Sequence, residues 1–328
     1  MRRVCLGVRA PSLAFLVVSL LNPIVTLVAT AQEVPVPGSA ARYLLTEEWS
    51  VSAQGPVHLR EKQVKATYQL EVADQGVALN GNRRLTVHFK QVAVEANIPA
   101  QKRKGNFDSQ HPPVKLNVEH HELIRPLALW GQTLTFTISP EGTLKEAAGT
   151  DGVSRRLDEL YDQFLRGSEQ DLHTREIELH QVSAVDLCRR WGDLFVCCNV
   201  DRTKVDAAPG RRNEMVVIAC IPSESWMKPI EIPVLETVQV TTLAEGNVQI
   251  VKSANLTEPK TVRTTIGAVA WRYDPLSAKR ESTLQVRRDG RVEKLNSTST
   301  VVLATTLSIG AEVPIQMTIR HATEMSRQ

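Results

Sequence analysis

A strict two-residue alternation of apolar and polar side chains is the feature of this sequence that most constrains its fold. Residues 62–72 place an apolar side chain at every second position, and residues 85–92 repeat this pattern after an Asn80-Gly81-Asn82 turn. Successive side chains of a strand point to opposite faces of a sheet, so each segment is expected to be a strand with one buried face. The Asn-Gly turn between them favours a hairpin.

The same pattern predicts strands along most of the chain. A strand at 133–138 turns at 140–142 and returns at 143–146, whereas 99–113 is polar and basic and is expected to be a loop. Many later segments are rich in Thr and Val, which suit half-buried sheet surfaces. Further strands are expected at 215–221, 230–243, 248–253, 261–273, 280–287, 291–306 and 313–322, followed by a frayed tail at 323–328.

One segment follows the helical period instead. Between residues 152 and 165 the apolar side chains form a single stripe, and Gly167 is a natural stop. The stripe consists of Val153, Leu157, Leu160, Tyr161, Phe164 and Leu165. We expect a mainly β fold, an antiparallel sandwich or barrel-like, with two β-rich halves and one amphipathic helix near 152–165. The helix is expected to pack against the halves or to cover an open barrel mouth.

The first thirty-one residues have the organisation of an export signal. Three arginines precede an uncharged run, residues 10–31, that ends in Ala29-Thr30-Ala31. A basic start, an apolar centre and a small-x-small exit are what a signal peptidase recognises. We expect cleavage after Ala31 and a periplasmic or extracellular protein. The competing interpretation is an uncleaved anchor, because the run is long enough to span a bilayer core of about 30 Å.

These features divide the chain into segments. We expect a signal peptide at 1–31, a flexible linker at 32–41, a first β-rich half at 42–150, a connector with the helix and the cysteines at 151–214, and a second β-rich half at 215–328. Residues 135–145 resemble residues 283–293, which hints at an internal duplication of the two halves. The recurrence of a common hairpin explains this similarity equally well.

Cysteine usage agrees with an oxidising compartment. After the signal the chain has Cys188, Cys197, Cys198 and Cys220, an even set that predicts two disulfides. A bond between the adjacent Cys197 and Cys198 would strain the peptide between them, so each is expected to bond to Cys188 or Cys220. Four thiolates around zinc would lack the usual Cys-x-x-Cys spacing. Free buried thiols are the remaining alternative.

Composition argues against several function classes. Charged residues make up 23% of the chain and hydrophobic residues 42%, which is typical of a globular protein. The net charge of +3 falls once the signal arginines leave, and basic runs such as Lys102-Arg103-Lys104 are short. A nucleic-acid or anionic-membrane binder needs a concentrated basic face. The chain also has no Gly-rich phosphate loop, which argues against nucleotide chemistry. Neither nucleic acid nor a cofactor is an expected partner.

Candidate catalytic and metal-binding residues lie in one region. Asp108, Ser109 and His111 offer an acid, a hydroxyl and an imidazole, but sequence neighbours in a loop seldom form a triad. On a strand, His120 and His121 would point to opposite faces and could not bind one ion. The sequence therefore assigns no catalytic, cofactor-binding or metal-binding residue.

Several short motifs resemble a known family. They are Asp108-Ser109, residues 127–131, the strand through Ile138 with Gly142-Thr143-Leu144, Gly149, Tyr273-Asp274, Ser282 and Asp289-Gly290. Over about half of the mature chain this arrangement is similar to exported bacterial β-rich proteins grouped as a domain family of unknown function. The resemblance implies an exported sandwich-like or barrel-like architecture and carries over no catalytic residue. The cysteines and the Lys102-Arg103-Lys104 segment depart from the family pattern.

These features together predict an exported, non-enzymatic binding or envelope-structural protein. Its expected target is an apolar small ligand or another envelope protein, since a β interior offers a cavity or groove. The alternative is an exported hydrolase with a site assembled from distant residues, and its first candidates are Asp108, His111, His120 and Glu122. A third interpretation, an anchored protein that presents a β domain to a partner, applies if the signal is uncleaved.

Overall fold

The computed structural model describes residues 40–55, 61–98, 103–111, 121–140, 144–164, 210–220, 230–266, 269–308 and 312–328. The chain divides into two compact units, Met1–Gln32 and Glu33–Gln328, and every described residue belongs to the second. The predicted signal therefore lies outside the described residues, as does most of the cysteine-containing connector.

Strands dominate the described residues. Their bounds are β1 (Ala40–Gln54), β2 (Lys62–Val77), β3 (Arg83–Ile98), β4 (Arg103–Asp108), β5 (Thr133–Ile138), β6 (Leu144–Ala148), β7 (Gly210–Cys220), β8 (Ile230–Thr242), β9 (Val248–Leu256), β10 (Val262–Ile266), β11 (Val269–Val286), β12 (Val292–Ser308) and β13 (Glu312–Arg327). Two α-helices, α1 (His121–Leu129) and α2 (Thr150–Phe164), and a 3₁₀ turn at Ala244–Gly246 are the other elements of the described ranges. The prediction of a mainly β fold is confirmed.

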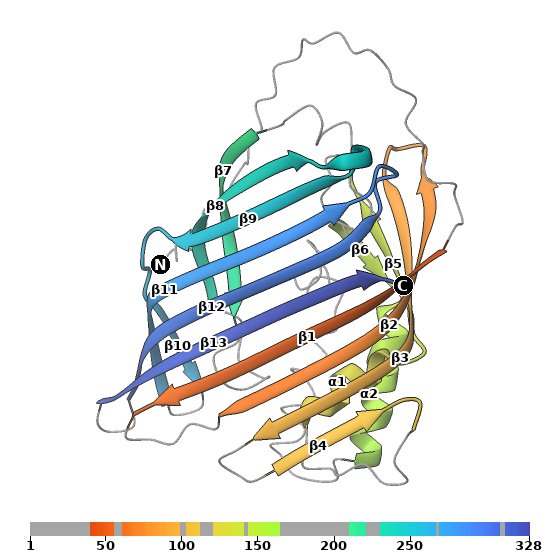
Figure 1. The fold of residues 1–328 in the computed structure, drawn as a ribbon. Helices are drawn as coiled ribbons and strands as arrows, with labels where there is room; N and C mark the ends of the chain where they lie inside the picture. Colours follow the sequence, from red (N-terminus) through yellow and green to blue (C-terminus); the bar gives the residue numbers. More distant parts are fainter. Residues whose placement is uncertain are drawn as a thin grey trace, which may run out of the picture. The chain divides into compact units, whose positions relative to one another are not determined.

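All thirteen described strands form one antiparallel sheet (Figure 1). Its order is β6-β5-β3-β2-β1-β13-β12-β11-β9-β8-β7, with β4 beside β3 and β10 beside β11. The first described strand, β1, pairs with the last, β13, from Tyr43 opposite Arg327 to Gln54 opposite Gln316. This pair joins the β-rich halves into one continuous sheet. The sheet is open, because β6 and β7 lie at its two edges.

Two long strands each pair with two shorter strands along one side. β5 pairs with residues 83–88 of β3 and β4 pairs with 93–98. In the same way, β10 pairs with residues 269–273 of β11 and β9 pairs with 279–286. The register shifts by one residue between the two partners, at Lys90 in β3 and at Leu276 in β11. A β-bulge bends a strand and increases its twist. This explains why β3 and β11 each pair with two short strands along one side and not with a single long strand.

The sheet has an apolar inner face and a polar outer face. Inner-face residues such as Tyr43, Leu45 and Val51 of β1 are buried, whereas the outer-face residues of this strand are at least partly exposed. The inner face carries two apolar clusters. Cluster I lies at the end of the sheet where β1 begins and includes Leu45, Tyr68, Phe89 and residues of both helices. Cluster II lies at the other end and consists of Val51, Ile218, Ile230, Ile232, Val234, Ala254, Trp271, Tyr273, Ala278, Val301, Leu303, Leu307, Ile315, Met317 and Ile319.

Helix α2 confirms the helix that the sequence predicts at 152–165. Its stripe residues Val153, Leu157 and Leu160 are buried in cluster I. The helix packs against α1 on the inner face of the sheet, near β3 (Figure 1). These stripe residues form a core contact, so the structure gives no support to an open barrel mouth beneath them.

Helix α1 is a second helix, which the sequence pattern did not predict. Leu123, Leu127 and Ala128 are buried in cluster I at helical spacing. Pro126 lies inside the helix, where it removes a hydrogen-bond donor and normally marks a break. The proline and the short length of the segment hid this helix in the sequence.

Three further expectations are wrong. The loop expected at 99–113 contains β4, an edge strand held by its pairing with β3. The single strand expected at 261–273 is the hairpin of β10 and β11, in which Val262 pairs with Tyr273. The expected tail at 323–328 belongs to β13 almost to its end, and the Gln328 amide donates to the Arg42 carbonyl at 3.0 Å. The polar side chains of β4 and the distant partner of the β13 end hid these two strand segments in the local sequence.

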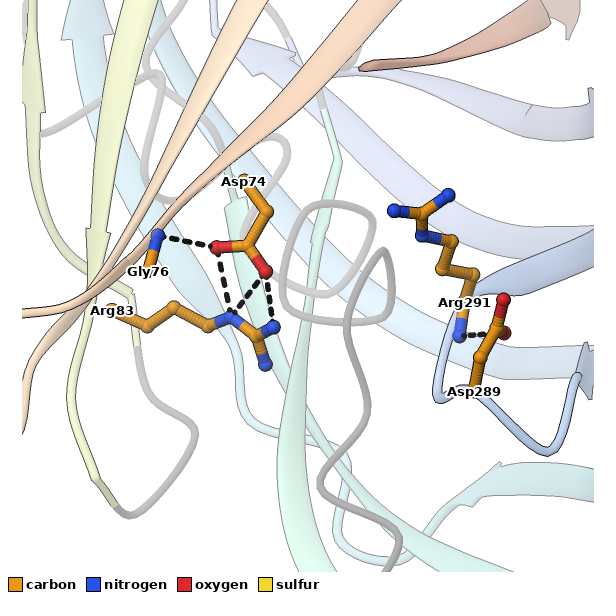
Figure 2. A network of polar contacts seen from close by, with 5 residues as sticks. All are labelled: Asp74, Gly76, Arg83, Asp289 and Arg291. Carbon is orange, nitrogen blue, oxygen red and sulfur yellow. Dashed lines mark hydrogen bonds and ion pairs between the residues drawn. The ribbon is translucent and has the colours of Figure 1, made fainter. Parts of the chain in front are cut away.

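Aspartates stabilise the ends of two hairpins at the cluster I end of the sheet, Asp74 at an irregularity of β2 and Asp289 in a turn. Asp74 accepts the Gly76 amide at 2.8 Å and binds Arg83, whose Nε lies 3.2 and 3.1 Å from the two carboxylate oxygens. In the β11–β12 hairpin, Asp289 accepts the Arg291 amide at 3.1 Å (Figure 2). An aspartate that binds the amide two residues on replaces a backbone contact of the turn. These polar contacts therefore have a structural role.

We expect Gly149→Ala to destabilise the protein more than Gly131→Ala. Both glycines have a positive φ, 89° and 74°, which costs an alanine about 1–2 kcal/mol. A Cβ at Gly149 would also lie 2.5 Å from the Thr133 carbonyl oxygen, whereas nothing lies within 4 Å of one at Gly131. Urea denaturation should show a loss of about 1 kcal/mol for Gly131→Ala and roughly 2–4 kcal/mol for Gly149→Ala. Equal losses would contradict the role of the carbonyl contact.

Candidate functional site

A belt of polar side chains crosses the inner face between clusters I and II. Residues that are paired across strands share a face, so the registers place these side chains in two adjacent rows. The first row is Glu47, Thr323, Ser297, Ser282 and Lys252. The second row is His321, Ser299, Arg280 and, beyond Ala254, Glu236. These nine residues are the polar belt.

A buried glutamate holds two cations at one end of the polar belt. Arg280 donates from Nε and Nη2 to Oε1 of Glu236, at 3.1 and 2.6 Å, and Nζ of Lys252 lies 3.8 Å from Oε2. The side chain of Glu236 is 1% exposed, that of Arg280 17% and that of Lys252 27%. A buried carboxylate costs several kcal/mol unless it is paired. The two cations therefore stabilise Glu236 in its buried position.

At the other end of the polar belt a carboxylate lies close to an imidazole. Oε1 of Glu47 lies 3.8 Å from Nε2 of His321, and the glutamate is buried while the histidine side chain is 40% exposed. Between the two ends, the hydroxyls of Ser282 and Ser297 lie 2.7 Å apart. The polar belt thus runs from β1 through β13, β12, β11 and β9 to β8.

Solvent reaches the inner face along the polar belt. His321, Arg280 and Lys252 are partly exposed, and so are the small polar residues of β12 and β13 between them. The rows of side chains on either side of the polar belt are buried. On the cluster I side the row contains Leu45, Met325, Leu295 and Leu284, and on the cluster II side it contains Val51, Ile319, Val301 and Ala278, all of which are buried. The result is an accessible polar strip between two apolar surfaces.

One hydroxyl in cluster II has no hydrogen-bond partner among the described residues. Thr305 pairs with Tyr273 of β11 and with Ile315 of β13 on the inner face, and it is 1% exposed. Its Oγ1 is buried and makes no hydrogen bond to any other described residue. Around it the surface is apolar and aromatic, with the rings of Trp271 and Tyr273 stacked at 5.9 Å. Leaving a buried hydroxyl unsatisfied costs about 1–3 kcal/mol, so a hydrogen-bond partner at this atom would stabilise the protein.

The structure brings together two of the residues that the sequence singles out as a hydrolase site. Nδ1 of His111 lies 3.3 Å from Oδ2 of Asp108, and both side chains are exposed. The amide of Gln110 and the ring of His111 hold the pKa of Asp108 below its usual value. Ser109 does not join them, because its Oγ accepts the Val92 amide at 2.9 Å. His120 and the side chain of Glu122 lie outside the described residues.

We expect Ser109→Ala to lower the free energy of unfolding by about 1–3 kcal/mol, because the buried Val92 amide loses its acceptor. His111→Ala is the matched control two residues away. Its side chain is 82% exposed, so its effect should stay within about 0.5 kcal/mol. Chemical denaturation of both variants measures the difference. A Ser109→Ala variant as stable as the wild type would contradict the structural role of this hydroxyl.

The predicted disulfides involve residues that are mostly not described. Cys188, Cys197 and Cys198 lie outside the described residues, and Cys220 ends β7 with a side chain that is not described. The pairing of these four cysteines stays a prediction. Among the residues of known placement, no group of three or more His, Cys, Asp or Glu side chains could hold a metal ion. No helix within the described ranges is long and apolar enough to cross a membrane.

Sequence reasoning missed the polar belt, although a signal for it exists. Each of its strands carries a charged or hydroxyl residue where the alternation calls for an apolar one. Glu47 follows Tyr43 and Leu45 on the inner face of β1, and Glu236 lies between Val234 and Val238 on β8. Such an interruption on the apolar face of one strand suggests a buried polar group. Only the pairing register shows that the interruptions of six strands lie side by side.

Comparisons with known proteins give only weak similarities. No protein-family model and no curated protein matches this chain. Lipovitellin is 10% identical with a TM-score of 0.38, over 89% of this chain and 25% of lipovitellin, so the chain spans about a quarter of that protein. The β domain of the Bordetella autotransporter BrkA is 8% identical with a TM-score of 0.19, over 88% and 98% of the two chains. A DUF3598-family protein of unknown function from Nostoc punctiforme is 10% identical with a TM-score of 0.14, over 85% and 94%. Similarities at this level identify neither a family nor a function.

Proposed function

We propose that this protein is an exported, non-enzymatic binding protein that takes an apolar ligand with a polar group on the inner face of its sheet. The observation that carries the proposal is the buried hydroxyl of Thr305, which has no partner among the described residues. A ligand with a hydrogen-bonding group would satisfy this hydroxyl and bury its apolar part against cluster II. Export is supported by the organisation of residues 1–31.

The ligand lies in cluster II, next to the polar belt. Both described helices pack on cluster I, whereas the described residues of cluster II all come from strands. Thr305 and Ser299 are six residues apart on β12, which corresponds to about 20 Å at 3.3 Å per residue. Val301 and Leu303 lie between them on the inner face. An acyl chain in one leaflet spans about 15 Å, half of the hydrocarbon core, so a long-chain amphiphile would cover roughly three quarters of this apolar interval.

The side chains of cluster II can rearrange around a ligand without a change of fold. Met317 lies on β13, directly opposite Leu303 of β12, and is fully buried. Its unbranched, flexible side chain can adopt other rotamers as a ligand enters. The accessible polar belt provides the neighbouring surface from which a ligand enters and at which a second polar group stays hydrated.

Native mass spectrometry of the protein purified from its own exported fraction tests this proposal. We expect a bound mass of lipid size, which is lost under denaturing conditions. Delipidated protein should then bind palmitic acid or palmityl alcohol, whereas a short-chain alcohol should not compete. A protein that carries no small molecule and binds neither probe would contradict the proposed function.

Thr305→Val should raise stability and weaken binding at the same time. The valine replaces an unsatisfied buried hydroxyl with a methyl group, which is expected to stabilise the ligand-free protein by about 1 kcal/mol. The same change removes the partner of the ligand's polar group, so the affinity for palmityl alcohol should fall roughly tenfold. Urea denaturation and a binding titration measure the two effects.

Thr306→Val is the matched control, because Thr306 is the next residue of β12 and lies on the outer face. It should leave the affinity unchanged. If Thr305→Val lowers stability, or leaves the affinity at the wild-type value, the role given to this hydroxyl is wrong.

A further inference from the structure

Strand β7 forms an accessible edge of the sheet. Among the described strands it pairs only with β8 (Figure 1). Residues 211–215 are exposed at five consecutive positions, so both faces of this part of the strand are open to solvent. The edge of a strand is a row of backbone donors and acceptors that can add another strand.

The charges on this edge favour self-pairing. Edge strands are commonly protected by charges that repel a second strand. Here the inner-face pair Arg212 and Glu214 has opposite signs, two residues apart, with Arg212 Nε 3.6 Å from Glu214 Oε1. When two copies of this segment run antiparallel, Arg212 of each copy can pair with Glu214 of the other.

We propose that β7 of a second copy of this chain pairs antiparallel with β7, about a two-fold axis at Asn213. In this register Arg212 lies opposite Glu214 of the second copy, and Glu214 lies opposite Arg212, which gives two cross-strand ion pairs on the inner face. The inner faces of the two sheets stay on the same side, because residues directly opposite each other share a face. The dimer would have one sheet continuous through both copies.

Other symmetric registers lack this complementarity. An axis at Arg212 or at Glu214 places that residue opposite its own copy, with like charges in contact. An axis at Met215 places both charged residues opposite apolar positions of β7, Val216 and Ile218. Like charges directly opposite each other are destabilising, whereas opposite charges stabilise a strand pair.

The outer face of the proposed pair is also complementary. Met215 and Leu235 are paired there, and both are exposed. With the axis at Asn213, Arg211 of the second copy lies opposite Met215. The aliphatic part of an arginine side chain covers apolar surface while its guanidinium stays in water. The dimer thus buries part of an exposed apolar surface that includes Met215.

Charge reversal tests the register. We expect the wild-type chain to dimerise reversibly in sedimentation velocity at micromolar concentrations. Arg212→Glu and Glu214→Arg should each weaken the dimer at least tenfold, since each replaces two attractive pairs with two repulsive ones. The double variant Arg212→Glu/Glu214→Arg should restore it to near the wild-type affinity. The side chains are exposed, so circular dichroism should show that every variant is folded.

Mixing the two single variants tests the proposed register most directly. The Arg212→Glu and Glu214→Arg chains are each mismatched with themselves, but in a mixed pair every Arg faces a Glu. They should form a heterodimer when mixed, although each alone is a monomer. A wild-type chain that stays monomeric, or single variants that dimerise as well as the wild type, would overturn the proposal. Ligand binding by the monomer is independent of this result.

Discussion

Glu236→Gln is expected to lower the free energy of unfolding by about 3 kcal/mol. The side chain keeps its size but loses its charge, and Arg280 and Lys252 lose the carboxylate that they share on the inner face. Removing one partner of a buried ion pair leaves the other partner's charge uncompensated, and this typically costs about 3–5 kcal/mol. We expect the lower end of this energy range because Arg280 and Lys252 both keep some contact with solvent. Urea denaturation with a fitted slope measures the effect.

Two controls isolate the cause. Arg280→Met should cost less than Glu236→Gln, because Lys252 still lies beside the carboxylate when the arginine is gone. Glu281→Gln removes a charge from the adjacent, exposed position on β11 and should change stability by no more than about 0.5 kcal/mol. A Glu236→Gln variant as stable as Glu281→Gln would contradict the buried ion cluster.

Phe89→Ala is expected to cost about 3–5 kcal/mol, the range found for large core aromatics. Phe89 is fully buried in cluster I, and its ring meets that of Tyr68 edge to face at 5.8 Å. Its backbone also holds the end of α1, because its carbonyl accepts the Gly131 amide at 2.9 Å and its amide donates to the Gln132 carbonyl at 3.0 Å. The substitution leaves a cavity where β3, β2 and the helices meet.

Phe89→Leu and Lys90→Ala serve as comparisons for this substitution. The leucine fills much of the space, so the loss should be roughly 1–2 kcal/mol. Lys90 is the extra residue of the bulge and points to the outer face beside Glu71, so its removal should cost less than about 1 kcal/mol. Thermal and urea unfolding should give the same order. If all three variants are equally stable, Phe89 is not a core residue.

The strands and the long helix could be predicted because their signals are local. Alternation identifies β2, β3 and β5 from their own residues, and the stripe of α2 is complete within its own four turns. Each of these elements has one buried face, so the period of its apolar side chains can be recognised from its own consecutive residues. The antiparallel, mainly β fold follows from them.

The sheet order and the candidate site depend on contacts between distant residues. The pairing of β1 with β13 brings residue 43 beside residue 327, which no local pattern indicates. The polar belt requires the register of six strands, since a slip of one residue would move a strand's charges to the outer face. The unsatisfied hydroxyl of Thr305 is invisible in the sequence, because a threonine in a strand ordinarily finds a partner or solvent.

Tryptophan quenching tests the central claim, that a ligand binds against cluster II, most directly. The chain has five tryptophans, of which Trp271 lies in cluster II and Trp130 packs beside cluster I. Two variants, each retaining one of these and carrying phenylalanine at the other four positions, would be titrated with a brominated palmitic acid. Bromine quenches indole fluorescence only at short range, so we expect strong quenching of Trp271 and little of Trp130. Saturable binding that quenches Trp130 and leaves Trp271 unchanged would contradict the account.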